Sequence, residues 1–322
     1  MKRILAAALG VLATAVNPLM AQEFPSKNIT LVVPFAAGGP SDIIGRLLAQ
    51  SMTQTLKTQV LVENVAGASG TLAINRVAKA QPDGYTILIS HVNHAATAIL
   101  YRSLPYNPVE DFAPIGLVTD GAMVILGKKD TKANTISELA GLIKEKNEAL
   151  TFAHAGIGSG AHLCGLQLMS ALSSKLTVVT YRGTGPALND LVSGQIDLMC
   201  DQVTSALPQV QAATVKSFAV TTKDPLPSLP IPSMEQAGFK GFEVNVWHGL
   251  YAPKGTPQPV VTKLTEALQS AMKDPLILKR LDELSTTPVT AARQTPQALR
   301  DHLMAEIAKW RPIIQAAGQY SD

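Results

Sequence analysis

The 322-residue sequence has few charges, few aromatic rings and only two cysteines. Charged residues make up 16% and aromatic residues 5% of the chain, whereas hydrophobic residues make up 46%. This composition excludes a disordered polyelectrolyte and is typical of a globular protein long enough for two domains. The formal net charge is only +3. Because binding to nucleic acid would need a basic stripe, we expect no nucleic-acid partner.

The scarcity of cysteine limits the covalent and metal chemistry of the chain. Cys164 and Cys200 could form a disulfide in an oxidising compartment, or they could be free thiols that pack as small apolar groups. Free thiols are the favoured prediction for two cysteines in so long a chain. No histidines, cysteines and acidic residues have the spacing of a zinc site, so we expect neither a metal nor another cofactor.

Long apolar runs are also scarce, and the one of note stands at the N-terminus. The run Ile4–Val16 follows two basic residues and precedes the small residue Ala21. This order is typical of a secretory signal peptide, and the run is too short to span a bilayer comfortably. We therefore predict that residues 1–21 are a cleaved signal peptide and that the mature protein is soluble in the periplasm.

Short apolar runs alternate with helical patterns along the rest of the chain. Strands are predicted at 29–34, 60–63, 85–90, 123–127, 150–153, 177–180, 196–200 and 218–221. Helices are predicted at 41–55 and 71–80, after the capping box that begins at Thr135, and at Thr256-Pro257 and Thr295-Pro296. The alternation predicts an α/β fold in which helices cover both faces of parallel sheets.

Glycine-rich or polar loops follow five of the predicted strands. Their sequences are FAAGG (35–39), NVAGASG (64–70), SHVNH (90–94), HAGIGSGAH (154–162) and YRGTGP (181–186). Ligands of such folds bind at the carboxyl ends of the strands. The free N–H groups of these loops, and of the helix starts behind them, suit an anion.

These loops carry motifs that resemble the signatures of one known family. The motifs are Pro34-Phe-x-x-Gly-Gly-x-x-Asp42 with Arg46, Asn64-x-x-Gly67 with Gly70, and Gly156-x-Gly-Ser-x-x-His162. Segments 181–197, 229–238 and 249–257 resemble its later landmarks. The sequence is thus similar, over nearly its whole length, to the tripartite tricarboxylate transporter substrate-binding proteins, or Bug family. Gly45 and Ser69 depart from the family pattern, in which Ala and Gly are usual.

The resemblance implies a two-domain periplasmic-binding-protein fold, or Venus flytrap, with parallel-rich sheets and two crossing hinge strands. Domain 1 would comprise residues 22–122 and 247–322, and domain 2 residues 123–246. The implied function is capture of a small organic carboxylate between the domains and its delivery to the integral-membrane subunits of a tripartite tricarboxylate transporter. We expect a monomer. The ligand could be a C4 dicarboxylate, a citrate-like acid or an aromatic acid.

The predicted ligand-binding residues come from both domains. They are Phe35, Ala37, Gly38, Gly39, Asp42, Ala68, Ser69, Ser90, His91, Asn93, Gly156, Gly158, Ser159, His162, Arg182, Gly183 and Asp201. Asp42 could instead pair with Arg46 along a helix, and His91 could be a satisfied surface histidine. Arg182 could meet a second carboxylate or remain solvated in its loop. Asp201 could accept a hydrogen bond from a ligand hydroxyl or amine, or cap the following helix.

A secreted α/β hydrolase-like enzyme acting on a small acid is the alternative. The segment Gly156–Gly160 contains a serine, but in the fourth position rather than the third that Gly-x-Ser-x-Gly requires. The first strand is not followed by the Gly-x-Gly-x-x-Gly of nucleotide-binding folds. With no nucleophile and base at a recognisable spacing, the sequence predicts binding without catalysis.

Overall fold

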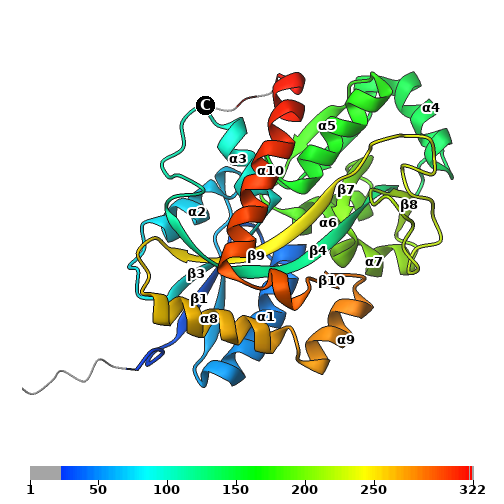
Figure 1. Cartoon of the computed structure of the whole chain (residues 1–322). Coiled ribbons are helices and arrows are strands. Elements are labelled where there is room, and N and C mark those ends of the chain that lie inside the picture. Colours follow the sequence, from blue (N-terminus) through cyan, green and yellow to red (C-terminus); the bar gives the residue numbers. More distant parts are fainter. Residues whose placement is uncertain (1–22, 319, 321–322) are drawn as a thin grey trace, which may run out of the picture.

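A computed structural model describes residues 23–318 and residue 320, and the predicted signal peptide lies outside them (Figure 1). The strands are β1 (Ile29–Val33), β2 (Val60–Asn64), β3 (Thr86–His91), β4 (Phe112–Lys128), β5 (Thr151–His154), β6 (Thr177–Thr180), β7 (Leu198–Gln202), β8 (Val215–Val220), β9 (Asn245–Pro253) and β10 (Thr287–Pro288). The α-helices are α1 (Pro40–Leu56), α2 (Thr71–Ala78), α3 (Val92–Leu100), α4 (Ile136–Lys146), α5 (Gly160–Leu172), α6 (Thr184–Val192), α7 (Val203–Gln211), α8 (Gln258–Ala271), α9 (Pro275–Glu283) and α10 (Pro296–Ala317).

The strands form one mixed sheet in the order β2-β1-β3-β9-β4-β7-β5-β6, with β8 and β10 paired to β4. The outer pairs β1–β2, β1–β3, β5–β6 and β5–β7 are parallel, as predicted. The described pairs that involve β4 or β9 are antiparallel. The sheet is therefore parallel toward both edges and antiparallel in its middle.

Two long strands, β4 and β9, join the two ends of this sheet and run side by side through the molecule (Figure 1). The part of β4 up to Ala122 pairs with β9, and the part from Met123 pairs with β7 and β8. This is the predicted two-domain architecture with two crossing strands. The exact domain limits, 22–122 with 247–322 and 123–246, stay a prediction.

The first half of β4 was not predicted from the sequence. Pro114 and Gly116 are typical strand breakers, because proline cannot donate to a ladder and glycine packs poorly. The structure tolerates them through a register irregularity between these two residues.

The helix starts largely follow the predicted capping signals. Thr135 and Thr295 cap α4 and α10, and their hydroxyls accept from the N–H groups of Glu138 and Ala298. Thr256 does not cap α8, which is a correction: the capping residue is Pro257, and the Thr256 hydroxyl donates to the Pro253 carbonyl instead.

Cys164 on α5 and Cys200 on β7 form a disulfide, which corrects the favoured prediction of free thiols. Both cysteines are fully buried. Their separation of 36 residues did not reveal that the fold brings α5 against β7. The bond ties the first turns of α5 to the end of β7.

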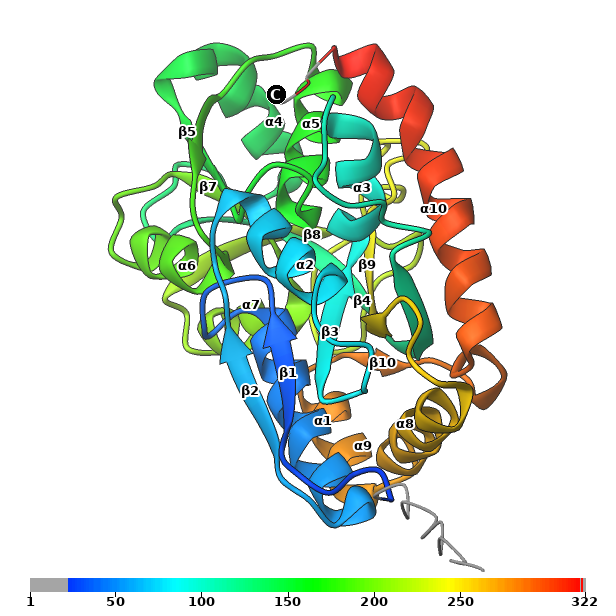
Figure 2. The same cartoon turned by 90° about the vertical axis from the view of Figure 1, so that its left-hand side faces the viewer.

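Helix α10 packs against α3 and runs along one side of the molecule (Figure 2). The buried carboxylate of Glu306 on this helix accepts hydrogen bonds from the indole nitrogens of Trp247 and Trp310, both at 3.1 Å. Because Trp247 belongs to β9, the bond ties α10 to a crossing strand. Within the described residues, no helix combines the length and apolar character needed to cross a membrane.

Candidate functional site

A small, narrow cavity lies where loops from both ends of the sheet meet. Six of the predicted residues line it: Phe35, Gly39, Asp42, His91, Ser159 and Asp201. We call the loop 35–39 with the start of α1 the first half-site. The loop 155–159 with the start of α5 is the second half-site.

The first half-site presents the start of α1 to the cavity. Gly39 is the N-cap in an extended conformation, and Pro40 and Ser41 follow in the first turn and line the cavity. The first N–H groups of a helix have no carbonyl four residues earlier to accept them. Within the described part of the chain, no backbone acceptor takes the Ser41 N–H. This helix start can therefore donate to an anion.

Asp42 holds the first half-site in shape. Its carboxylate accepts from the Gly38 N–H at 3.0 Å and from Arg46 Nε at 3.1 Å, which confirms the predicted helical pair. Arg46 also donates to Asn64 at 3.2 Å. Burial raises the pKa of Asp42, but the hydrogen bonds from Arg46 and Gly38 outweigh it and lower the pKa overall. Asp42 is thus ionised, and its bonds are made within the protein.

A buried histidine that the sequence did not single out supports the same helix start. His248 on β9 lies 3.1 Å from the Ser41 hydroxyl through Nε2 and 3.2 Å from the Thr119 hydroxyl through Nδ1. Burial lowers the pKa of His248 to about 3. A neutral ring thus links α1 to both crossing strands. Lone histidines in strands give no sequence signal for such a role.

His91 closes another wall of the cavity. Its ring stacks on Phe35 at 4.9 Å between centroids, and its Nδ1 accepts from the Asn93 N–H as the N-cap of α3. Burial and the neighbouring His248 lower the pKa of His91 far below its usual value. The Ser90 hydroxyl donates to the Asn93 side chain, and both residues are fully buried.

The second half-site presents the start of α5. Ser159 is the N-cap, and its hydroxyl oxygen accepts from the His162 N–H at 3.2 Å. The hydroxyl hydrogen of Ser159 remains available to donate. Gly160 and Ala161 line the cavity, and no backbone acceptor among the described residues takes their N–H groups.

The N–H groups of the preceding glycine loop are already paired. Gly156 donates to Nδ1 of His154 at 3.0 Å, and Gly158 donates to Nδ1 of His162 at 3.2 Å. Burial and the nearby His162 lower the pKa of His154 to about 3. Neither glycine N–H is left for an anion in this conformation. The loop therefore affects the site through its shape, and the available donors belong to the first turn of α5.

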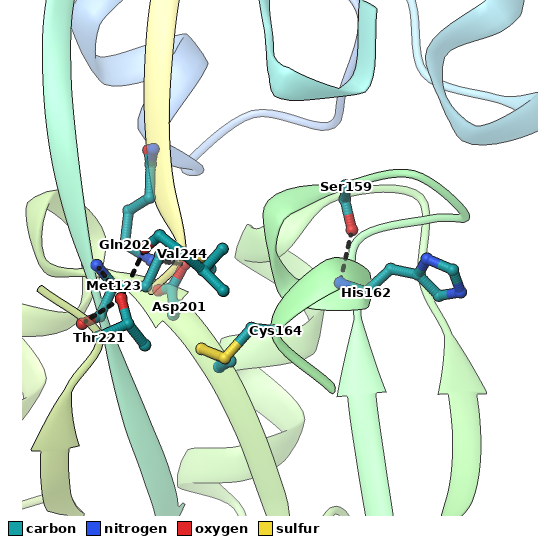
Figure 3. The surroundings of a disulfide bond; sticks show 9 residues. Met123, Ser159, His162, Cys164, Asp201, Gln202, Thr221 and Val244 are labelled. Carbon is teal, nitrogen blue, oxygen red and sulfur yellow. Dashed lines mark hydrogen bonds between the residues drawn. A yellow bond between two sulfur atoms is a disulfide. The ribbon is translucent and has the colours of Figure 1, made fainter. Parts of the chain in front are cut away.

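Asp201 lies at the end of β7, next to the disulfide (Figure 3). Its carboxylate accepts from the Ser205 hydroxyl at 2.7 Å and from the Gln202 N–H at 2.8 Å. Burial raises the pKa of Asp201 to about 7, although both hydrogen bonds lower it. The alternative that Asp201 caps α7 is wrong, because Gln202 is the capping residue.

Loops from the two ends of the sheet touch beside the cavity, so the structure is closed. The Ala36 N–H donates to the Arg182 carbonyl at 3.0 Å. The Ile157 N–H donates to the Ser69 hydroxyl at 2.8 Å. A Cβ atom at Gly183 would lie 2.7 Å from the Ala36 nitrogen, so the backbones approach too closely for a side chain there.

The remaining predicted residues lie outside the cavity wall. Ala68, Ser69 and Arg182 line a neighbouring hollow, and the Arg182 side chain is exposed. Ala37, Gly38, Ser90, Asn93, Gly156, Gly158, His162 and Gly183 line neither space. Sequence reasoning missed wall residues at the first turns of helices and at the end of β7: Gly160, Ala161, Thr184 and Gln202. Only the helix-start signals could have indicated the first three.

Within the described residues, no three histidine, cysteine or acidic side chains gather as metal ligands would.

Comparison with known proteins places this geometry in context. Residues 44–319 match the model of a family described as the tripartite tricarboxylate transporter family receptor. The periplasmic binding protein BugD is 43% identical, with a TM-score of 0.91 over 93% of this chain and 100% of its own. MatC from Rhodopseudomonas palustris, solved with malate, is 38% identical with a TM-score of 0.88, covering 90% and 100% of the two chains. Another R. palustris protein, solved with adipate, is 30% identical with a TM-score of 0.87, covering 92% and 99%.

Proposed function

The chain belongs to the tripartite tricarboxylate transporter receptor family, or Bug family, and we propose that it captures a small dicarboxylate for such a transporter. Members of this family are periplasmic solute-binding proteins and not enzymes, which confirms the prediction of binding without catalysis. The hydrolase-like alternative therefore loses its support.

One observation carries the proposed ligand class. The unpaired N–H groups of Ser41 in the first half-site and of Gly160 and Ala161 in the second line the same cavity. Helix N-termini attract anions because their free N–H groups and the helix dipole both favour negative charge. A carboxylate that bridges the two helix starts would stabilise the closed form, since it contacts both sides.

The dicarboxylate class is inferred from relatives. MatC was solved with malate and the second R. palustris protein with adipate. With few aromatic side chains in the wall, this cavity suits an aliphatic acid better than an aromatic one. Secretion to the periplasm and docking to the membrane subunits are what we expect of a member of this family, and together with a monomeric state they complete the proposal.

A thermal-shift screen tests the ligand class. Succinate, malate, adipate, citrate, benzoate and nicotinate are each compared with the uncharged amide of the same skeleton. A ligand at about one hundred times its Kd stabilises the folded state by roughly 2.7 kcal/mol. We expect at least one dicarboxylate to shift the melting temperature and its amide to have no effect. Equal shifts from acid and amide, or none from any acid, would contradict the proposal.

Removal of a single donor tests the site. Ala161→Pro deletes one N–H in the first turn of α5, a position where proline is compatible with a helix. We expect it to weaken carboxylate binding at least tenfold in calorimetry. Ser137→Pro makes the same change at the same position of the remote helix α4 and should leave the affinity unchanged.

A further inference from the structure

Two neighbouring residues of the cavity wall carry buried hydrogen-bond acceptors. Asp201 and Gln202 end β7, line the cavity, and are only 2% and 4% exposed. A buried acceptor without a partner costs free energy, so each one calls for a physical explanation, and a bound ligand is one such explanation.

The Asp201 carboxylate is incompletely paired. An ionised carboxylate offers about four acceptor positions. The described residues supply two donors, the Ser205 hydroxyl and the Gln202 N–H, and no ion pair. Burial has thus placed a carboxylate against a cavity without a protein cation to balance it.

The side-chain amide of Gln202 has the same deficit. Its nitrogen donates to the Val246 carbonyl at 3.3 Å, which fixes the orientation of the amide, because a flipped amide would set oxygen against oxygen. Its oxygen is buried and has no hydrogen-bond partner within the described structure. A donor in the cavity is what this oxygen lacks.

Both residues line the same cavity as the start of α5. A Cβ atom at Gly160 would collide with the side chain of Val246, the residue whose carbonyl binds Gln202. The disulfide between Cys164 and Cys200 ties the same helix to the residue before Asp201. A carboxylate on the α5 start would therefore lie in the same small cavity as both acceptor residues.

We propose that Asp201 and Gln202 form an acceptor subsite that selects acids with a hydroxyl or ammonium group on the carbon next to the bound carboxylate. The inference rests on the proposed carboxylate function. Sites that must hydrogen-bond a substrate group discriminate strongly against analogues without it, because their own polar groups are left unpaired. An unsubstituted acid would leave Asp201 and Gln202 without this hydrogen-bond donor.

Matched acids test the subsite without any mutation. Calorimetry at pH 8 compares three series that differ only at that carbon: propionate, lactate and alanine; succinate, malate and aspartate; phenylacetate, mandelate and phenylglycine. In each series that binds, we expect the hydroxy or amino acid to bind at least tenfold more tightly than the parent. If every parent acid binds as tightly as its derivatives, the subsite is overturned while the carboxylate function stands. If no acid binds, both the acceptor subsite and the proposed carboxylate function are overturned.

Variants test which of the two side chains causes the preference. They also distinguish a ligand hydroxyl from a ligand ammonium group. Gln202→Met should reduce the preference for the substituted acid to less than threefold. Gln167→Met is the matched control, because its amide oxygen is also buried without a described partner but lies in a different hollow. It should keep the full preference. Asp201→Asn, which keeps an acceptor oxygen but loses the charge, should spare hydroxy acids and weaken amino acids at least tenfold. An unchanged preference in both subsite variants would overturn the inference.

Discussion

The two half-sites have the same plan but are held by different chemistry. In each, a strand leads through a glycine-containing loop to a helix start that faces the cavity. In the first half-site, Asp42 binds Arg46 and Gly38, and α1 is further fixed by His248. In the second, a disulfide ties α5 to β7. One anion-binding plan can thus be supported either by charge or by a covalent bond.

Of the changes that test this comparison, removal of the disulfide should cause the largest loss of stability. Closing a loop of this length stabilises a protein by about 3–4 kcal/mol in the chain-entropy model. We expect Cys164→Ala with Cys200→Ala to lower the free energy of unfolding by about that amount in urea denaturation. Arg46→Ala, which removes an ion pair with one exposed partner, should cost less than about 1 kcal/mol. Equal losses would show that the two supports do not differ in strength.

Low pH should destabilise the folded protein, because each half-site is supported by a neutral buried histidine. His248 and His154 have pKa values of about 3 when folded, below the usual 6.5. Below pH 6.5 the unfolded chain binds protons that the folded chain does not, so stability falls as pH falls toward 3. Asp201, with its pKa raised to about 7, acts oppositely between pH 7 and 4.

We therefore expect the free energy of unfolding, measured with urea, to fall by at least about 2 kcal/mol from pH 7.5 to pH 5. The pKa values of His91 and His94, which burial also lowers, act in the same direction. Asp201→Asn removes the opposing group and should deepen that fall. A stability that is constant or rises over this range would contradict neutral burial of the two histidines.

Closure also brings α6 against the first half-site, and a single methyl group should block it. A Cβ atom at Gly185 in α6 would collide with the Ala37 carbonyl, although the backbone of Gly185 is helical. Gly185→Ala should therefore fold normally and weaken ligand binding at least tenfold, about 1.4 kcal/mol. Gly141→Ala in α4 adds the same methyl group in open space and should leave the ligand affinity unchanged. Unaltered affinity in Gly185→Ala would show that binding does not need this contact.

The smallest expected effect concerns the Ser69 hydroxyl, which contacts the loop of the second half-site. Ser69 has a positive φ of 55° and accepts from the Ile157 N–H. Ser69→Gly removes this bond but relieves the strained backbone. We expect binding to weaken by about threefold, while the melting temperature of the ligand-free protein rises or stays constant. A tenfold loss would assign Ser69 to direct ligand contact.

Local signals in the sequence predicted much of the first half-site. The spacing of Asp42 and Arg46, and the glycines before a helix, are visible within ten residues. The outer strands and the caps at Thr135 and Thr295 were predicted for the same reason. Contacts that depend on the crossing strands were not, because nothing near His248 or Cys200 in the sequence indicates what the fold brings against them.

Loop glycines also misled the prediction of the site in one respect. Their N–H groups looked available for a ligand, but His154 and His162 accept from Gly156 and Gly158. The donors left over belong to the helix start that follows. A sequence shows which residues can donate but not which acceptors the fold has already placed beside them.

The bond between Glu306 and both indoles has a spectroscopic consequence. Trp247 and Trp310 are the only tryptophans in the chain. Both are fully buried, both donate to one carboxylate where β9 meets α10, and neither lines the cavity. Intrinsic tryptophan fluorescence of this protein therefore observes the junction of a crossing strand with the C-terminal helix rather than the bound solute. With a non-absorbing acid, a change in emission upon ligand addition therefore reports motion of that junction.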